Sequence, residues 1–170
     1  MYNQKIKEMT IFAMFGAIMF ISKLIMEFLP NIHPLGLFIT VLTLLYRVKA
    51  IIPIYVYVLL NGLYAGFATW WVPYTYIWLI LWALIMIIPK NASNKVIFIL
   101  SLLFNGIFGL AFGFLYMPFQ AFAFGLNLQG AISWFIAGLP FDVLHMCGNI
   151  AMSFLVLPLY KTLKRFVIKK

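Results

Sequence analysis

Long apolar runs, separated by short polar segments, make up most of this chain. The stretch from Ala50 to Pro89 contains no Asp, Glu, Lys or Arg, and neither does the stretch from Val96 to Phe141. Each is far longer than the roughly 20 residues that cross the hydrocarbon core of a bilayer. The run from Ile77 to Trp82 lacks the alternation of a barrel strand. Because backbone polar groups in lipid must be paired internally, the pattern predicts an all-α membrane protein.

The composition agrees with this interpretation. Of the 170 residues 66% are hydrophobic, and a water-soluble domain of this size needs a more polar exterior. The net charge of +9 would suggest a nucleic-acid partner in a soluble protein, but here the basic residues flank apolar runs, so none is expected. Cys147 is the only cysteine, which excludes an intrachain disulfide and a metal–thiolate cluster. We expect no metal and no cofactor.

The spacing of charges predicts a single domain of six membrane-spanning helices. The expected spans are 8–29, 33–46, 50–69, 74–89, 95–117 and 140–161, with Pro118 ending the fifth. Residues 119–139 are expected to form an outer-face loop or a helix extension kinked at Pro140. With both termini in the cytoplasm, eleven of the 12 basic residues fall on the cytoplasmic side, as the positive-inside rule requires of a multi-pass protein in a prokaryotic plasma membrane.

Charged, imidazole and aromatic side chains gather at the expected outer level of the helices. Intramembrane ionisable groups are costly, so their presence points to a function, and we expect a pocket open to the outside that binds a small polar, ring-containing solute. Several of these residues also have possible structural roles that involve no ligand. Glu27 would form an ion pair with Lys23, Asp142 would cap a helix, and the aromatic residues would form a belt at the membrane interface. The candidate binding residues at this level are Glu27, Asn31, His33, Trp70, Trp71, Tyr74 and Asp142.

A deeper polar tier lies near the middle of the expected bilayer. Asp142, His145 and Asn149 share one helix face through their three- and four-residue spacing, which adds His145 and Asn149 to the candidate binding residues. Asn61 and Asn105 lie at the depth of Asn149. These asparagines form either the pocket floor or interhelical hydrogen bonds.

Motifs of known enzyme classes are missing from the sequence. There is no paired-histidine zinc motif, no nucleophile elbow and no phosphate-cradling glycine loop. Asp142 and His145 form an acid–base pair in principle, but no second acid, metal-ligand set or nucleophile accompanies them. A catalytic role is therefore not expected.

The segment Ala13-Met14-Phe15-Gly16-Ala17 carries small residues on one face of the first helix, a pattern typical of close helix packing. It also resembles the Ala-x-x-x-Ala motif of the S components of energy-coupling factor (ECF) vitamin transporters. Chain length, six expected crossings, basic loops and the segment Gly-Leu-Pro-Phe-Asp-Val-Leu-His at 138–145 are similar to that family along the whole chain.

The resemblance implies a division of labour. An S component captures a vitamin or related micronutrient from outside, and Ala13, Gly16 and Ala17 would dock onto a separate coupling membrane subunit driven by two cytosolic ATPases. No signature for a particular vitamin is present. The alternatives are a stand-alone secondary carrier or channel, for which inverted repeats are not apparent, and a small membrane enzyme.

Overall fold

Helices account for every regular element of the computed structural model, which describes residues 2–168. No strand occurs in that range. The all-α prediction is therefore confirmed. The elements in chain order are α1 (Tyr2–Ile25), α2 (Leu35–Tyr46), the 3-10 helix η1 (Arg47–Ala50), α3 (Ile51–Ala65), the 3-10 helix η2 (Thr69–Trp71), α4 (Tyr74–Met86), α5 (Asn94–Phe124), α6 (Leu128–Ser153) and α7 (Val156–Ile168).

Within residues 2–168, five helical runs are long and apolar enough to cross a membrane, which indicates a membrane-embedded protein. They are Gln4–Ile25, Leu35–Ala65, Thr69–Met86, Asn94–Phe124 and Leu128–Ser153. The second run is not one straight helix, because Arg47, with φ 54°, separates α2 from α3. A left-handed backbone at a non-glycine residue interrupts an α-helix.

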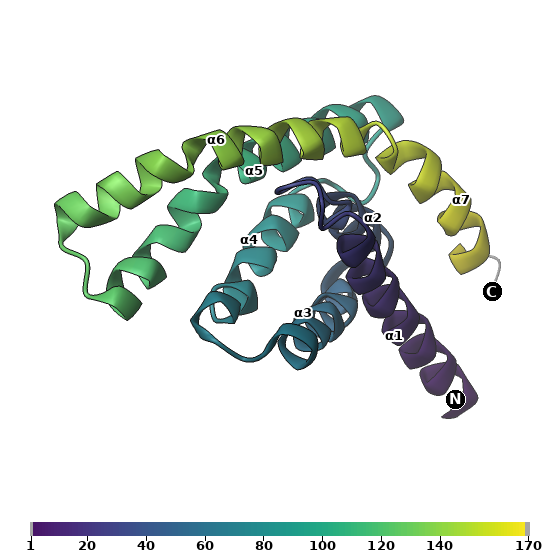
Figure 1. Ribbon diagram of the computed structural model, residues 1–170. Helices are drawn as coiled ribbons and strands as arrows, with labels where there is room; N and C mark the ends of the chain where they lie inside the picture. The colour runs from purple at the N-terminus through teal and green to yellow at the C-terminus, as the bar shows by residue number, and fades with distance from the viewer. Residues whose placement is uncertain (1, 169–170) are drawn as a thin grey trace.

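The helix ends fall on two sides of the molecule. In Figure 1 the N-terminal end of α1, the C-terminal end of α7 and the α4–α5 connection lie on the right. The α3–α4 and α5–α6 connections lie on the left. Successive helices therefore run back and forth between two ends.

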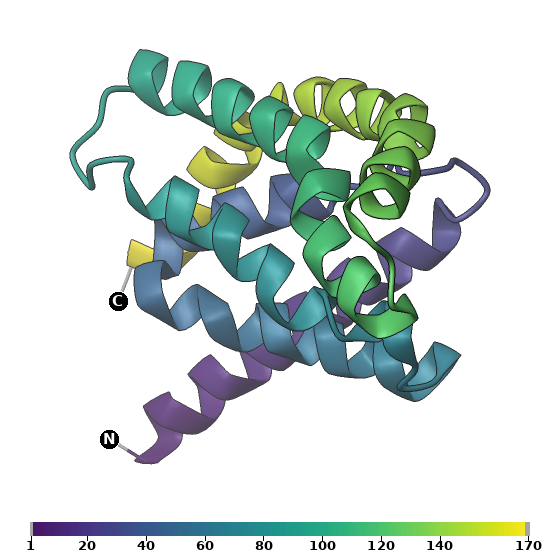
Figure 2. The same ribbon diagram turned by 90° about the vertical axis from the view of Figure 1, so that its left-hand side faces the viewer.

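The two longest helices, α5 and α6, lie side by side in both views (Figures 1 and 2). Their close approach depends on glycine. A Cβ atom at Gly109 of α5 would lie 2.7 Å from the backbone nitrogen of Met146 in α6, and one at Gly113 would meet the Asp142 carboxylate. Small residues of this kind let helix backbones come together in membranes.

The C-terminal half differs from the sequence prediction at Pro118, which does not end the fifth helix, since α5 continues through it to Phe124. The segment 119–139, expected as an outer-face loop or a helix extension, is mostly helical. A short connection around Gly125 joins α5 to α6, which passes through Pro140. Neighbouring helices tolerate proline by satisfying the freed backbone groups in a membrane protein.

The last helical stretch is also divided. The expected span 140–161 covers the end of α6, a turn at Phe154 and Leu155, and the start of α7. Ser153 donates its hydroxyl to the carbonyl oxygen of Asn149 one turn before this break. Such bonds from serine to the preceding turn bend helices.

Candidate functional site

Two histidines meet inside the bundle. His33 belongs to the connection between α1 and α2, and His145 lies in α6; their ring centroids are 5.0 Å apart. His145 is 1% exposed. Neither of its ring nitrogens, nor Nδ1 of His33, makes a hydrogen bond to a described residue.

Aromatic rings surround this pair. The ring of Phe112 in α5 lies 4.9 Å from that of His145, and the Trp78 ring of α4 lies 6.0 Å from that of His33. Tyr74 and Tyr57 stand edge-on to Trp78 at 5.6 and 5.9 Å. The buried indole nitrogen of Trp78 and the Tyr57 hydroxyl have no hydrogen-bond partner among the described residues. The pair is thus enclosed by apolar ring faces and further unused polar atoms.

Asp142 lies three residues before His145 on the buried face of α6. Its Oδ1 atom accepts a hydrogen bond from the backbone N–H of Gly113 at 3.0 Å, while the buried Oδ2 atom accepts none from any described residue. The alternative that Asp142 caps a helix is wrong, because α6 begins at Leu128 and is capped by Asn127, whose side chain accepts from the N–H of Gly130.

Asn105 and Asn149 form a second polar layer between α5, α6 and α2. Asn105 donates to Thr40 Oγ1 at 2.9 Å and to the carbonyl of Ser101 at 2.8 Å, and Asn149 donates to the carbonyl of Asn105 at 3.2 Å. Because a carbonyl only accepts, these bonds fix which amide atom is nitrogen. Both amide oxygens are left without a donor and converge on Gly36, where a Cβ would lie 2.6 and 2.9 Å from them.

Asn61 does not join that layer through a hydrogen bond. Its amide donates to the carbonyl of Tyr57 one turn earlier in α3, at 2.9 Å. Its link to the histidine pair runs through the Tyr57 ring, which contacts Trp78.

Several residues predicted from the sequence lie at the edge of this cluster. Glu27 is 60% exposed and pairs with Lys23 at 3.7 Å. Asn31, at φ 56°, donates its amide to the carbonyl of Phe141 at 3.2 Å and so ties the α1–α2 connection to α6. Trp71 donates its indole N–H to the carbonyl of Val58 at 2.8 Å, and Trp70 reaches the cluster only through its edge contact with Tyr74 at 5.5 Å.

Sequence reasoning missed the aromatic walls and the hydroxyl groups. Trp78 follows the candidate Tyr74 by one helical turn, and Phe112 follows the candidate Asn105 by seven residues, or two turns. Helical periodicity from these candidates would therefore have found both. Thr40, Thr43 and Ser101 are buried polar residues in otherwise apolar helices, a signal equal to that of the asparagines.

His33 is neutral at physiological pH. Burial lowers the pKa of its imidazole from 6.5 to about 4, and the positive charge of Lys23 also acts to lower this pKa. A neutral imidazole offers one donor and one acceptor. The cluster therefore presents both kinds of polar group to a solute, beside the Asp142 oxygen that lacks a partner.

Among the described residues no group of three or more His, Cys, Asp or Glu side chains is placed to hold a metal ion. A cavity of about 620 Å³ lies elsewhere, between α1 and α7, and none of the predicted binding residues lines it.

The three residues expected to dock onto a coupling subunit are not equivalent. Gly16 is buried against α3, where a Cβ would lie 3.0 Å from the carbonyl oxygen of Pro53. Ala13 is exposed and Ala17 is half-buried. Only the two alanines therefore offer surface outside the helix pair.

Comparison with protein-family models, with curated proteins and with solved structures found no match to this chain. What the site does is therefore inferred from the residues described above.

Proposed function

We propose that this chain is the substrate-binding S component of an ECF-type importer, which captures a small water-soluble vitamin or related micronutrient. The proposal rests chiefly on one observation. Three buried ring nitrogens of His33 and His145 and one buried oxygen of Asp142 lack hydrogen-bond partners among the described residues, within a wall of aromatic rings.

Such an arrangement favours a ligand with a flat ring and several polar substituents. A buried polar group without a partner costs about 1–3 kcal/mol, so a solute that supplies donors and acceptors here recovers a large free energy on binding. Ring faces and edges add stacking contacts. Water-soluble vitamins combine a ring with polar groups in this way.

Six crossings with both termini in the cytoplasm belong to the same proposal. Arg47 divides the long Leu35–Ala65 run into two helices, and the ends of α1 and α7 lie on the side of the α4–α5 connection (Figure 1). That arrangement is the one expected if α2 and α3 each cross the membrane. The basic residues Arg47, Lys49, Lys90 and Lys95 then share the cytoplasmic side with both termini.

The exposed Ala13 and half-buried Ala17 face is the proposed contact with a coupling membrane subunit, and through it with two cytosolic ATPases. Small side chains permit close packing of a partner helix. The plasma membrane of a prokaryote is the proposed location.

The binding proposal is tested by a thermal-shift screen of water-soluble vitamins on the purified protein, followed by titration of any hit. We expect His145→Phe and Asp142→Asn to weaken binding at least tenfold, because each removes a hydrogen-bond acceptor from the cluster. Leu144→Ala, on the exposed side of α6, is the control and should bind as the parent does. No vitamin hit, or a hit that survives both cluster substitutions, contradicts the proposal.

The coupling proposal needs a separate measurement. The tagged protein is purified from its native membrane and the retained proteins are identified by mass spectrometry. Replacing Ala13 and Ala17 with Trp should abolish retention of a membrane subunit and ATPases, whereas Leu110→Trp on the exposed face of α5 should not. Uptake of the vitamin by liposomes containing this chain alone would instead indicate a stand-alone carrier.

A further inference from the structure

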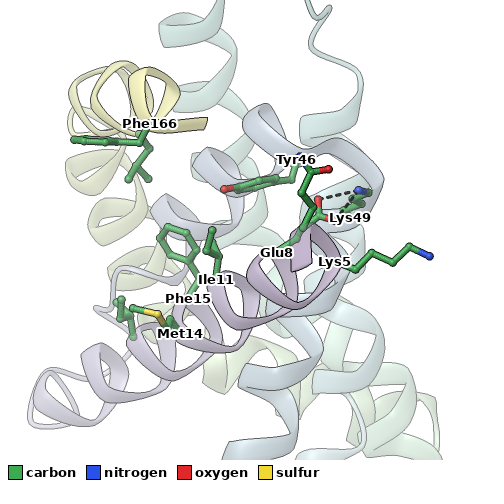
Figure 3. Close-up of a pocket in the computed structure, with 11 residues that line it drawn as sticks. Lys5, Glu8, Ile11, Met14, Phe15, Tyr46, Lys49 and Phe166 are labelled. Carbon is green, nitrogen blue, oxygen red and sulfur yellow. Dashed lines mark hydrogen bonds and ion pairs between the residues drawn. The ribbon is translucent and has the colours of Figure 1, made fainter. Parts of the chain in front are cut away.

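A groove between α1 and α7 is separate from the histidine cluster. Its cavity volume is about 620 Å³, within the range of small-molecule sites. Figure 3 shows Phe166 of α7 across from Phe15 and Met14 of α1, with the Tyr46 hydroxyl directed into the space between the two helices. The residues that line it are Gln4, Lys5, Glu8, Ile11, Met14, Phe15, Ile18, Tyr46, Lys49, Leu163 and Phe166.

The lining changes from polar to apolar along α1. Lys5 and Glu8 stand at one end, and Ile18 stands at the other. Fourteen residues separate Gln4 from Ile18, which is about 21 Å of helix. One leaflet of a bilayer has about 15 Å of hydrocarbon, half of the core thickness, beneath a polar headgroup layer. The groove therefore matches one leaflet in both length and polarity.

The charge at the polar end is positive. Lys49 is paired with Glu8 at 2.8 Å, and Lys5 forms no ion pair with a described residue. The groove lining therefore holds two basic side chains, Lys5 and Lys49, against the one acidic side chain of Glu8. Basic residues near the membrane surface attract anionic lipid by about 1 kcal/mol each.

A transmembrane helix fits this groove less well than an acyl chain does. A helix about 10 Å in diameter and 21 Å long would occupy roughly 1,600 Å³, well over twice the cavity volume. Ala13, on the proposed coupling face, lies about 160° around α1 from Ile11 and Phe15, whereas Ala17 lies about 60° from the groove residue Met14. The groove is therefore centred on a different face of α1 from Ala13, and it borders the proposed coupling surface at Ala17.

We propose that this groove binds one anionic phospholipid, with an acyl chain along Ile11, Phe15 and Ile18 and the phosphate at Lys5 and Lys49. The Tyr46 hydroxyl lies at the level of the ester groups, where tyrosine side chains commonly stand. The site is independent of the proposed import function, since no residue of the histidine cluster contributes to it.

Native mass spectrometry of the detergent-purified protein with added dioleoyl phosphatidylglycerol or dioleoyl phosphatidylcholine tests this inference. We expect one tightly retained phosphatidylglycerol and at least tenfold weaker retention of phosphatidylcholine. Equal retention of the two lipids, or a co-purified polypeptide protected in the groove, overturns the proposal.

Two pairs of variants locate the bound lipid. Lys5→Gln should weaken phosphatidylglycerol retention about fivefold, the equivalent of 1 kcal/mol, and more than Lys7→Gln, which removes a charge that does not line the groove. Met14→Trp should fill the apolar part and abolish retention, while Met9→Trp on another exposed face of α1 should not. If the two variants of a pair retain phosphatidylglycerol equally well while the protein stays folded, the lipid is not in this groove.

Discussion

At the scale of single residues, glycine sets the distance between α5 and α6. Gly109 meets the backbone of Met146 and His145, and Gly113 makes room for the Asp142 carboxylate. Backbone atoms of a packed helix cannot move aside as a flexible side chain can. The candidate site on α6 therefore depends on positions of α5 that carry no functional group.

Gly109→Ala should destabilise the protein by about 1–3 kcal/mol, since the added Cβ would lie 2.7–2.9 Å from backbone atoms of α6. At this chain length a loss of 1 kcal/mol lowers the thermal midpoint by about 2–4 °C. Gly138→Ala is the matched control, because no atom lies within 4 Å of its Cβ position. It should leave the midpoint unchanged or raise it, as alanine favours helix. Equal midpoints for the two variants would refute the close-contact argument.

The buried imidazole of His33 makes stability depend on pH. Its pKa is about 4 in the folded protein and about 6.5 in the unfolded chain, so between these values the unfolded state binds more protons. Stability is therefore complete above about pH 6.5 and declines on acidification, by roughly 2 kcal/mol between pH 7 and pH 5. Thermal midpoints measured across this range should fall less steeply in His33→Gln. The same slope in both proteins would contradict a buried neutral His33.

At the scale of elements, the C-terminal end of α4 is capped by a residue that lies far away in the sequence. The Arg47 guanidinium donates to the carbonyls of Met86 at 2.6 Å and Ile88 at 3.0 Å, and the Trp82 indole donates to the carbonyl of Arg47 at 3.1 Å. The last carbonyls of a helix have no partner within it, and a cation is favourable there. The residue that separates α2 from α3 thus also caps α4.

Arg47→Met should lower the free energy of unfolding by about 1.5–3 kcal/mol, the range for hydrogen bonds to charged groups. Lys90→Met provides the comparison, because Lys90 is an exposed cation just beyond α4. Its substitution should change stability by less than about 0.5 kcal/mol. Thermal unfolding of the two variants in one detergent measures the difference, and a similar small effect in both would show that the Arg47 cap contributes little.

At the scale of the whole molecule, the back-and-forth order of helices sets which loops share a side. The α4–α5 connection lies with the ends of α1 and α7, and the α5–α6 connection lies opposite (Figure 1). In the described part of the chain, five apolar helical runs are long enough to cross a membrane. A sixth crossing requires that α2 and α3, which Arg47 separates within Leu35–Ala65, each span the bilayer.

Single cysteines in a Cys147→Ala background test this topology. With six crossings, cysteines replacing Gln4 and Asn91 should react with an impermeant maleimide only after cells are permeabilised, and one replacing Leu128 should react in intact cells. Five crossings would put Gln4 and Asn91 on opposite sides, and their labelling would then differ.

The spacing of residues along the sequence determined some features of this protein by itself. The helical class follows from apolar runs, the Lys23–Glu27 ion pair follows from a four-residue separation, and the shared buried face of Asp142, His145 and Asn149 follows from helical periodicity. Each depends on residues within one continuous segment of the chain, so no knowledge of neighbouring helices is needed.

Only the tertiary structure decided which helices meet. It brought His33 beside His145, surrounded them with Trp78 and Phe112, joined Asn105 to Asn149, and left Glu27 exposed at the edge. In the tertiary structure α5 also continues through Pro118, and a groove of about 620 Å³ lies between α1 and α7. These features depend on packing between segments far apart in the chain, and periodicity within one helix carries no information about its partner.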